Sequence, residues 1–246
     1  MVIPKLDNEE LSSKAQKVLM SLLKQGMFDD TNMIPPEAEL ASSLGISRTA
    51  VRDALSTLES QGVITRRRGI GTIINKHVLN VTSRLDLEKE FLEEITDAGY
   101  VPSVGFIDIK IELATEAAVN HLKVNFGEEL FVIEKLILAD GKPAIYCLDY
   151  LAKRLVIDHD FDSEELRKPI FEFLERRCKV SVETDLTQLV PIIADNHLAE
   201  IFNISIGTPL IHLDEVGYDL KGNAVLWSKE YYCPGIINFT ILRRKI

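Results

Sequence analysis

Arginine side chains gather in one short stretch of the sequence. Arg48 and Arg52 lie four residues apart with Thr49 between them, and three consecutive arginines follow at 66–68. A guanidinium group donates hydrogen bonds as a planar fork, which suits a carboxylate, a phosphate or the edge of a guanine. Residues 48–78 hold six basic and two acidic side chains. The stretch therefore predicts an anion-binding surface for a phosphate backbone, with an ordinary solvated basic face as the alternative.

The spacing of apolar residues predicts the helix that would hold Arg48 and Arg52. Ser47 can cap this helix by accepting a hydrogen bond from a backbone N–H of its first turn. Behind the cap, apolar residues recur at intervals of three and four, as on a helix with one buried face: Val51, Ala54, Leu55 and Leu58. Gly62 closes the helix, and both arginines fall on its polar side.

A shorter helix is predicted just upstream. Pro35, Pro36 and Glu37 suit a first helical turn, because proline has the required backbone angle and a carboxylate faces the positive end of the helix dipole. Its apolar stripe consists of Leu40, Ala41 and Leu44, and Gly45 suits the turn that ends it. Two helices joined by such a turn form a helix-turn-helix, whose second helix presents its polar N-terminal face to base edges. A further amphipathic helix is expected from Glu10 to Gly26.

Two short strands are predicted after the helices. They span Val63–Thr65 and Thr72–Ile74, and are joined at Arg68–Gly71. The glycines let the tip of this hairpin approach a phosphate backbone closely, and the neighbouring arginines supply the counter-charge. A tip of this kind can reach into the minor groove, where arginine is favoured. Each part alone also fits a plain helical hairpin or a solvated strand edge, but all of them in order within about forty residues predict DNA binding.

Composition limits the class of protein. The chain has 246 residues and a net charge of −10, distributed as +1 over residues 1–78 and −11 over residues 79–246. No apolar run approaches the ~20 residues of a membrane span, and no secretory signal begins the sequence. The three cysteines (Cys147, Cys178, Cys233) are scattered, which fits a reducing cytoplasm and argues against a disulfide framework or a zinc site.

The remaining sequence predicts a domain of mixed helices and strands. Residues 75–85 have the composition of a linker, and residues 86–98 are expected to form a helix that ends before Gly99. A weak internal repeat then relates residues 114–150 to residues 194–232, each copy reading as helix, turn, strand, hairpin turn and strand. The repeat predicts a pseudo-symmetric domain built on an antiparallel sheet.

The segment IPPEAELASSLGISRTAVRDALSTLESQGVITRRRGIGTII resembles the winged helix-turn-helix of the GntR family of transcriptional regulators. The resemblance implies base contacts by Arg48 and Arg52, phosphate contacts by Ser47 and Thr49, and an insertion of the wing tip into the minor groove. The expected DNA-binding set is Ser47, Arg48, Thr49, Arg52, Arg66, Arg67, Arg68, Gly69, Gly71 and Thr72. Ala38 stands where many members carry an arginine that touches DNA, so operator preference does not transfer directly.

The region over residues 86–244 resembles the UTRA effector-binding domain, which defines the HutC-type branch of that family and has a chorismate-lyase-like fold; its landmarks are FVIEKLILADGKPA and SKEYY. The expected fold class is therefore α+β, with an N-terminal winged helix-turn-helix and a C-terminal antiparallel-sheet α+β domain. We expect a DNA-binding domain over residues 1–76, a linker over 77–85, and an effector-binding and dimerisation domain over 86–246.

The resemblance also points to an effector site that departs from that of sugar-phosphate sensors. Where those proteins grip a phosphate with two arginines, this sequence has Lys135 and Ile137; where they hold the sugar with carboxylates, it has Cys147 and Leu226. The tyrosine near the C-terminal strand is retained as Tyr232. Alternation along the strands adds Asp149, Ser228 and Glu230 to the same faces. We therefore expect an effector with amine or hydroxyl donors that is not a sugar phosphate, the alternative being that Asp149 and Glu230 are rim charges or pair with Lys135.

Together these features predict a cytoplasmic transcriptional regulator that represses genes under the control of a small-molecule effector. A single recognition helix reads few bases, so we expect a homodimer on a palindromic operator in double-stranded DNA. No membrane partner, cofactor, metal site or catalytic residue is expected, since the five histidines are isolated and no catalytic motif is present. Two alternatives remain: a lyase-like enzyme fused to a DNA-binding head, and a DNA-binding protein without a ligand.

Overall fold

The computed structural model describes residues 11–81 and 83–243, which form two compact units. The first unit contains the described residues up to 87 together with those from 240 onward, and the second spans residues 88–239. Both units combine helices with antiparallel strands, so the expected α+β fold is confirmed. No helix in the described ranges is both long enough and apolar enough to cross a membrane.

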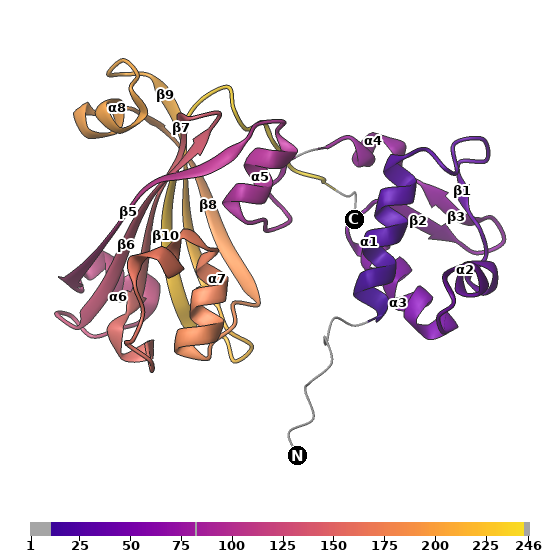
Figure 1. Ribbon diagram of the computed structural model, residues 1–246, viewed down its shortest axis with the longest axis horizontal. Helices are drawn as coiled ribbons and strands as arrows, with labels where there is room; N and C mark the ends of the chain where they lie inside the picture. Colours follow the sequence, from indigo (N-terminus) through magenta and orange to yellow (C-terminus); the bar gives the residue numbers. More distant parts are fainter. Residues whose placement is uncertain (1–10, 82, 244–246) are drawn as a thin grey trace. The chain divides into compact units, whose positions relative to one another are not determined.

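The first unit packs three helices against a small sheet (Figure 1). Its three-stranded sheet has the order β1-β3-β2, with all pairs antiparallel. Its elements are α1 (Leu11–Lys24), β1 (Met33–Ile34), α2 (Glu37–Leu44), α3 (Arg48–Ser60), β2 (Ile64–Arg67), β3 (Gly71–Ile74), α4 (Lys76–Leu79) and β4 (Ser83–Arg84). The first helix was expected from Glu10, which lies outside the described residues, and β2 continues two residues further than expected.

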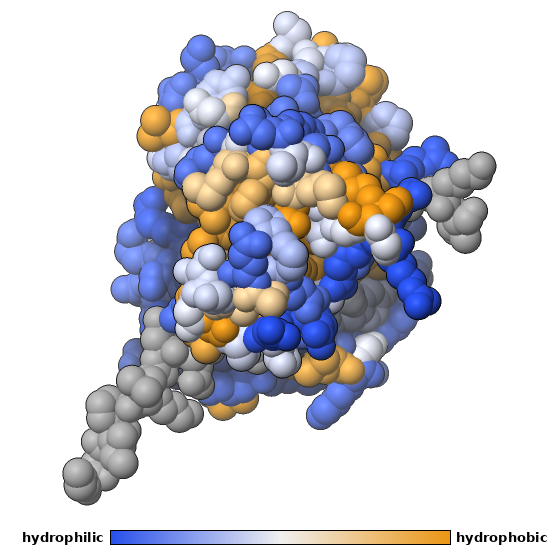
Figure 2. Space-filling model, turned by 90° about the vertical axis from the view of Figure 1, so that its right-hand side faces the viewer, coloured by the Kyte–Doolittle hydropathy of each residue, from blue (hydrophilic) through white to orange (hydrophobic). Residues whose placement is uncertain are grey.

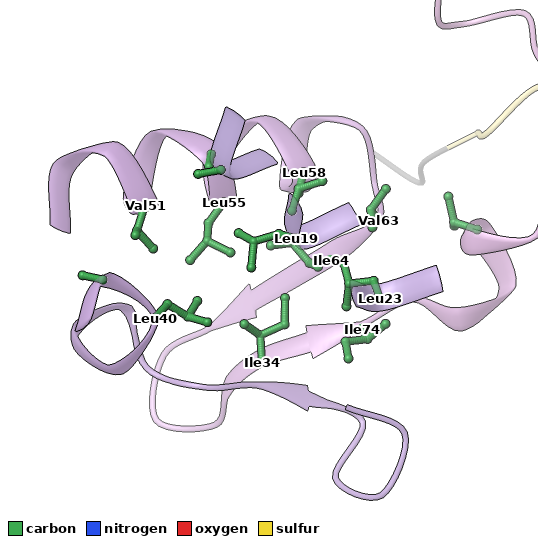
Figure 3. Packing of buried hydrophobic residues seen from close by; sticks show 14 residues of the cluster. Leu19, Leu23, Ile34, Leu40, Val51, Leu55, Leu58, Val63, Ile64 and Ile74 are labelled. Atoms are coloured by element: carbon green, nitrogen blue, oxygen red, sulfur yellow. The ribbon is translucent and has the colours of Figure 1, made fainter. Parts of the chain in front are cut away.

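The apolar stripes predicted for the helices meet in one core (Figure 3). The four residues expected on the inner face of α3 are each 1% exposed or less. Leu19 of α1 and Ile64 of β2 pack against them from the other elements. Gly45 ends α2 with φ +66°, a left-handed conformation that places the next helix at an angle to the first. This core fixes which side of α3 faces outward.

The structure divides the chain differently from the expected boundaries. Residues 77–85 were expected to be a linker, but they contain most of α4 and all of β4, and belong to the first unit. The last described residues return to that unit as well. The backbone N–H of Leu85 donates to the carbonyl of Thr240, and Leu242 packs against the first unit's core. The strand β11 (Phe239–Thr240) pairs with β4, so two stretches far apart in sequence complete one small sheet.

A six-stranded antiparallel sheet forms the second unit, in the order β5-β6-β7-β10-β9-β8 (Figure 1). Hairpins join β6 to β7 and β9 to β10, and β7 pairs with β10 at the centre. The strands are β5 (Pro102–Leu113), β6 (Glu129–Ala139), β7 (Lys142–Ala152), β8 (Thr184–Ile193), β9 (Pro209–Tyr218) and β10 (Ala224–Tyr232).

The predicted internal repeat corresponds to the two halves of this sheet. Each half runs strand, short helix, strand, strand; the helices are α6 (Glu116–Leu122) and α8 (Asn196–Phe202). Both helices lie on one face of the sheet and pack against strands of the opposite half. Ala118 of α6 packs with Trp227 of β10, and Leu198 of α8 packs with Tyr146 of β7. This exchange ties the two halves together.

The opposite face of the sheet is covered by α7 (Ile170–Phe173) and short helical segments around it. These are the 3₁₀ helices η1 (Lys153–Leu155) and η2 (Ser163–Arg167) and the π-helix η3 (Leu174–Cys178). The helix expected over residues 86–98 is shorter, because α5 spans only Phe91–Asp97. Residues 88–90 form no helix, Glu90 being extended, and they contribute to a pocket on this face. The acidic, helix-favouring composition of that stretch is therefore overridden by its place beside the sheet.

Candidate nucleic-acid interface and ligand pocket

The exposed face of α3 carries the residues predicted to meet DNA. The hydroxyl oxygen of Ser47 accepts a hydrogen bond from the backbone N–H of Ala50 at 3.1 Å, so Ser47 caps α3 as predicted. Arg48, Thr49 and Arg52 are all exposed. Because the other side of α3 is anchored in the core, these three side chains have a fixed outward direction, which is the arrangement expected of a recognition helix.

Arg52 is engaged by a carboxylate of the neighbouring helix. Its Nε and Nη2 donate to Glu37 Oε2 at 3.1 and 2.9 Å. The guanidinium holds the pKa of Glu37 below its ordinary value, while the carboxylate raises the pKa of Arg52. The Arg52 side chain nevertheless remains 58% exposed. Glu37 therefore ties the start of α2 to α3 and partly neutralises the surface that would meet phosphates.

Arg66 is placed differently from its neighbours in the wing. Its Nε donates to Glu59 Oε2 at 2.7 Å and its Nη2 donates to Ser56 Oγ at 2.8 Å. The backbone N–H of Arg66 also donates to Glu59 Oε1 at 2.9 Å. Glu37 approaches the same guanidinium at 3.9 Å. Arg66 thus fastens the wing to α3, a positioning role that the sequence analysis did not anticipate.

The tip of the wing is open. Arg67, Arg68, Gly69 and Gly71 are exposed, and Thr72, which faces Arg66 across the hairpin, is half-buried. Gly69 has φ +78° and Gly71 has φ +119°, so both positions favour glycine. A Cβ added to Gly71 would come within 2.6 Å of the Met33 side chain.

Three arginines on this surface have no ionic partner within the described residues: Arg48, Arg67 and Arg68. They are therefore available to bind phosphate or base edges without first breaking an ion pair. The space-filling view of the side where α2 and the small sheet lie shows hydrophilic residues over much of that surface, around a smaller hydrophobic area (Figure 2).

A narrow pocket lies in the second unit, between the sheet and the segments that cover it. The sheet contributes polar residues from β6, β7, β9 and β10, and the cover contributes residues 88–92 and 167–171. Apolar side chains such as Ile137 and Ile170 complete the wall.

Six of the eight residues predicted to bind an effector line this pocket: Lys135, Ile137, Asp149, Leu226, Ser228 and Glu230. The remaining two contact residues of that set. The Cys147 thiol donates to Asp149 Oδ1 at 3.2 Å, and the Tyr232 hydroxyl donates to Glu230 Oε2 at 2.6 Å. Alternation in the sequence placed Cys147 and Asp149 on one strand face and Ser228, Glu230 and Tyr232 on another, and the pairing of β7 with β10 brings these two faces together. Whether they bind an effector remains a prediction.

The three charged residues of the predicted effector set are buried, so they are not rim charges. Asp149 is 1% exposed, Glu230 5% and Lys135 3%. Lys135 Nζ lies 3.8 Å from Asp149 Oδ2, a distance that makes an ion pair but no hydrogen bond. Asp149 Oδ1 accepts a hydrogen bond from the Ser228 hydroxyl at 2.7 Å. One lysine therefore faces several carboxyl groups in a place with little water.

Three carboxyl groups of the pocket were missed by the sequence analysis. Glu215 lies on β9 directly opposite Ser228, and Glu88 and Glu90 come from the segment before α5. Burial raises the pKa of Glu215 and of Glu90 to about 7 in each case. Alternation along β9 could have placed Glu215 on the pocket face, but only with knowledge that β9 pairs with β10. No local signal places Glu88 and Glu90 there.

The other basic residues of the pocket wall are engaged by carboxylates. Arg167 Nε lies 2.8 Å from Glu164, and Lys168 Nζ lies 3.7 Å from Glu172. Lys89 pairs with Asp97. Since none of these three carboxylates lines the pocket, the pairs leave Lys135 as the main positive charge facing its interior.

Two histidines, His121 and His197, pack on the face of the sheet opposite the pocket. His121 of α6 stacks on Trp227 with ring centroids 4.4 Å apart, and its Nε2 lies 3.6 Å from Asp214. His197 of α8 occupies the related position against Tyr146. Within the described residues, no three His, Cys, Asp or Glu side chains are grouped so that they could hold a metal ion.

Comparisons with known proteins cover both units. A family model described as "Bacterial regulatory proteins, gntR family" matches residues 11–74, and one described as "UTRA domain" matches residues 97–234. The HTH-type transcriptional repressor NagR of Bacillus subtilis (strain 168) is 25% identical over 214 residues, which cover 87% of this chain and 86% of NagR. The HTH-type transcriptional regulator GgaR of Escherichia coli (strain K12) is 26% identical over 157 residues, which cover 64% of this chain and 61% of GgaR.

Solved structures share the fold. YydK from Bacillus subtilis subsp. subtilis str. 168 superposes with a TM-score of 0.76 and 17% identity, covering 96% of this chain and 100% of YydK. PhnF from Mycobacterium smegmatis has a TM-score of 0.56 and 19% identity, covering 92% of this chain and 98% of PhnF. At these identities the likeness concerns the fold alone.

Proposed function

This chain belongs to the GntR family of bacterial regulatory proteins, in the branch that carries a UTRA domain, and from that premise we propose that it represses transcription under the control of a small-molecule effector. That it is a DNA-binding transcriptional regulator of this type follows from both family matches and from the relatives named as regulators. Repression, effector control and the residues involved are the content of the proposal.

We assign DNA binding mainly to the exposed face of α3. Arg48 and Arg52 read base edges in the major groove, and Ser47 and Thr49 contact phosphates beside them. Arg67 and Arg68 bring the glycine-containing wing tip to the minor groove. Arg66 holds the wing against α3 through Glu59, so it supports binding mainly through position. The observation in favour is that the core anchors one side of α3 while the arginines stand on the other.

One α3 can read only a few bases, so two chains acting together would read a longer operator. A homodimer presents two recognition helices, which suits a palindromic operator with half-sites roughly one helical turn apart. The dimer forms through the second unit, as the resemblance to UTRA domains implies.

The buried polar pocket supports effector control. It lies in the second unit, whereas the DNA-binding residues lie in the first, so a ligand there acts at a distance. The chain crosses between the units twice, at residues 87–88 and 239–240, which offers two connections for such an effect. Control requires that the effector bind the DNA-bound and the released protein with different affinity.

Binding to DNA tests the proposal. The full chain is titrated against labelled fragments of the DNA upstream of its own gene, and against scrambled fragments of the same composition, at several salt concentrations. We expect one upstream fragment to bind tighter than its scrambled partner, with the preference lost in Arg48→Ala. A Lys14→Ala variant, which changes a basic residue of α1, is the matched control. Equal binding to all fragments at every salt concentration would contradict sequence-specific regulation.

A further inference from the structure

We propose that the pocket of the second unit binds a small organic cation, whose ammonium group is held by Asp149, Glu215 and Glu230. This inference rests on the proposed function in one respect, namely that the pocket is the effector site. It goes further by naming the chemical class of the ligand.

Carboxyl groups outnumber positive groups inside the pocket. Five carboxyl side chains line it, whereas Lys135 is the one lining cation not paired with a carboxylate from outside the pocket. Asp149, Glu215 and Glu230 are each less than 9% exposed, so water solvates them poorly. An uncompensated carboxylate is costly in such a place, and a bound cation reduces that cost.

Asp149 provides a second, independent observation. Its Oδ1 accepts hydrogen bonds from Ser228 and Cys147, whereas its Oδ2 is buried and accepts no hydrogen bond from any described residue. The Lys135 ammonium, at 3.8 Å, is too far to donate one. Asp149 lies in the wall of the pocket. A donor on a ligand would satisfy this oxygen, and an ammonium group supplies both the donor and the opposite charge.

The neighbouring carboxyl groups, with little positive charge near them, have raised pKa values. Burial raises the pKa of Glu215, and the nearby carboxyl groups of Asp185 and Asp149 raise it further, to about 7. Burial likewise raises the pKa of Glu230, with a further contribution from Glu215. A cation bound between these groups favours their ionised form, so binding and ionisation assist each other.

An anionic ligand fits this pocket poorly. A phosphate would have to approach Asp149, Glu215 and Glu230 with only Lys135 to offset the repulsion. The other basic residues of the lining, Lys89, Arg167 and Lys168, already pair with carboxylates that do not line the pocket. Apolar side chains such as Leu226 and Phe171 form the rest of the wall, and the pocket is narrow. Its walls therefore suit a short aliphatic or alicyclic amine.

Calorimetric titration of the full chain tests the inference. The probes are putrescine, ethanolamine and cyclohexylamine, each matched with a neutral analogue: 1,4-butanediol, ethylene glycol and cyclohexanol. Glucose 6-phosphate represents anionic ligands. We expect at least one amine to bind about tenfold or more tightly than its neutral analogue. The inference is overturned if no amine binds, or if only a phosphorylated sugar does.

Three variants locate the binding. Asp149→Asn keeps the shape of the side chain and removes its charge, so amine affinity should fall by about tenfold or more. Lys135→Gln removes the competing cation, so amine affinity should rise; a fall would indicate an anionic ligand and overturn the inference. Glu215→Gln repeats the test should Asp149→Asn not fold. Glu112→Gln changes an exposed carboxylate of β5 and should leave the affinity unchanged.

The same samples separate this inference from the proposed function. An amine that binds without altering affinity for the upstream DNA fragment supports the cation site and contradicts effector control. A phosphorylated sugar that binds and alters DNA affinity overturns the cation site and supports effector control. The two proposals can therefore fail independently.

Discussion

The guanidinium of Arg52 and the carboxylate of Glu37 form a forked ion pair that joins the second helix of the helix-turn-helix to the start of the first, with the shortest contact at 2.9 Å. With Nε and Nη2 on Glu37, one forked edge of the Arg52 guanidinium is occupied, and that edge cannot meet a guanine until Glu37 is released. The pair is accessible to solvent, so breaking it costs little. It therefore holds Arg52 in a defined place on the exposed face of α3.

Replacing Glu37 by Gln should increase binding to non-specific DNA. The change removes a negative charge from the DNA-facing side and frees Arg52, so affinity should rise about threefold or more at low salt, with a steeper dependence on salt. Stability should fall by less than about 1 kcal/mol, because the pair is exposed. Anisotropy titrations and thermal melting measure the two effects. The matched control is Glu39→Gln, an exposed residue of the same helix; unaltered DNA binding in Glu37→Gln would show that the pair does not matter.

Loss of Arg48 should mainly reduce sequence discrimination, whereas loss of Arg67 should mainly reduce overall affinity for DNA. Arg48→Ala should reduce discrimination between operator and scrambled DNA by about 1–3 kcal/mol, since a forked contact to a base is lost. Arg67→Ala should weaken binding to all sequences alike and lower the salt slope by about one. Titrations at four salt concentrations distinguish the two patterns. The same pattern in both variants would argue against this division.

Arg66 should behave as a structural residue of the wing. Its bonds to Glu59 and Ser56 join β2 to α3, so Arg66→Ala should destabilise the first unit by about 1 kcal/mol, which is a few degrees in melting temperature. Thermal unfolding of this variant is compared with that of Arg68→Ala, an exposed residue at the tip, which should melt like the parent. Equal melting of both variants would favour a direct phosphate contact by Arg66.

Leu242 should stabilise the DNA-binding unit from the far end of the sequence. It packs half-buried against that unit's core, so Leu242→Ala should cost about 1 kcal/mol of its stability. The adjacent Ile241 is 56% exposed, and Ile241→Ala should have little effect. Hydrogen exchange of α1 and α3 reports on this unit by itself. Protection unchanged by both substitutions would mean that the C-terminal segment contributes no stability there.

The carboxyl group of Glu215 should make the second unit less stable as pH rises. Burial raises its folded-state pKa from 4.5 to about 7, so between these values the folded protein binds more protons than the unfolded chain. Stability is therefore lost as pH increases through this range. In Glu215→Gln, the difference between the melting temperatures at pH 5.5 and pH 8 should be roughly 3 °C smaller than in the parent protein. Glu112→Gln should keep the parental difference; an unchanged difference in Glu215→Gln would mean that its pKa is ordinary.

The organisation of the DNA-binding unit could be predicted from the sequence because its signals are local. The cap at Ser47, the turn at Gly45 and the buried residues of α3 lie within a few helical turns of one another. The periodicity alone therefore decides which face is buried and which carries the arginines. Alternation along single strands likewise placed Asp149 with Cys147 on one strand face and Glu230 with Ser228 on another.

The partners of these residues were decided only by the tertiary structure. Glu37 meets Arg52 because α2 packs against α3, and Arg66 turns to Glu59 because β2 folds back along that helix. Glu215 lies in the pocket because β9 pairs with β10, and Glu90 because its segment forms no helix. Such contacts join positions far apart in sequence, and no local preference encodes them. Periodicity determines the direction of a side chain on its own element, whereas packing between elements determines what that side chain meets.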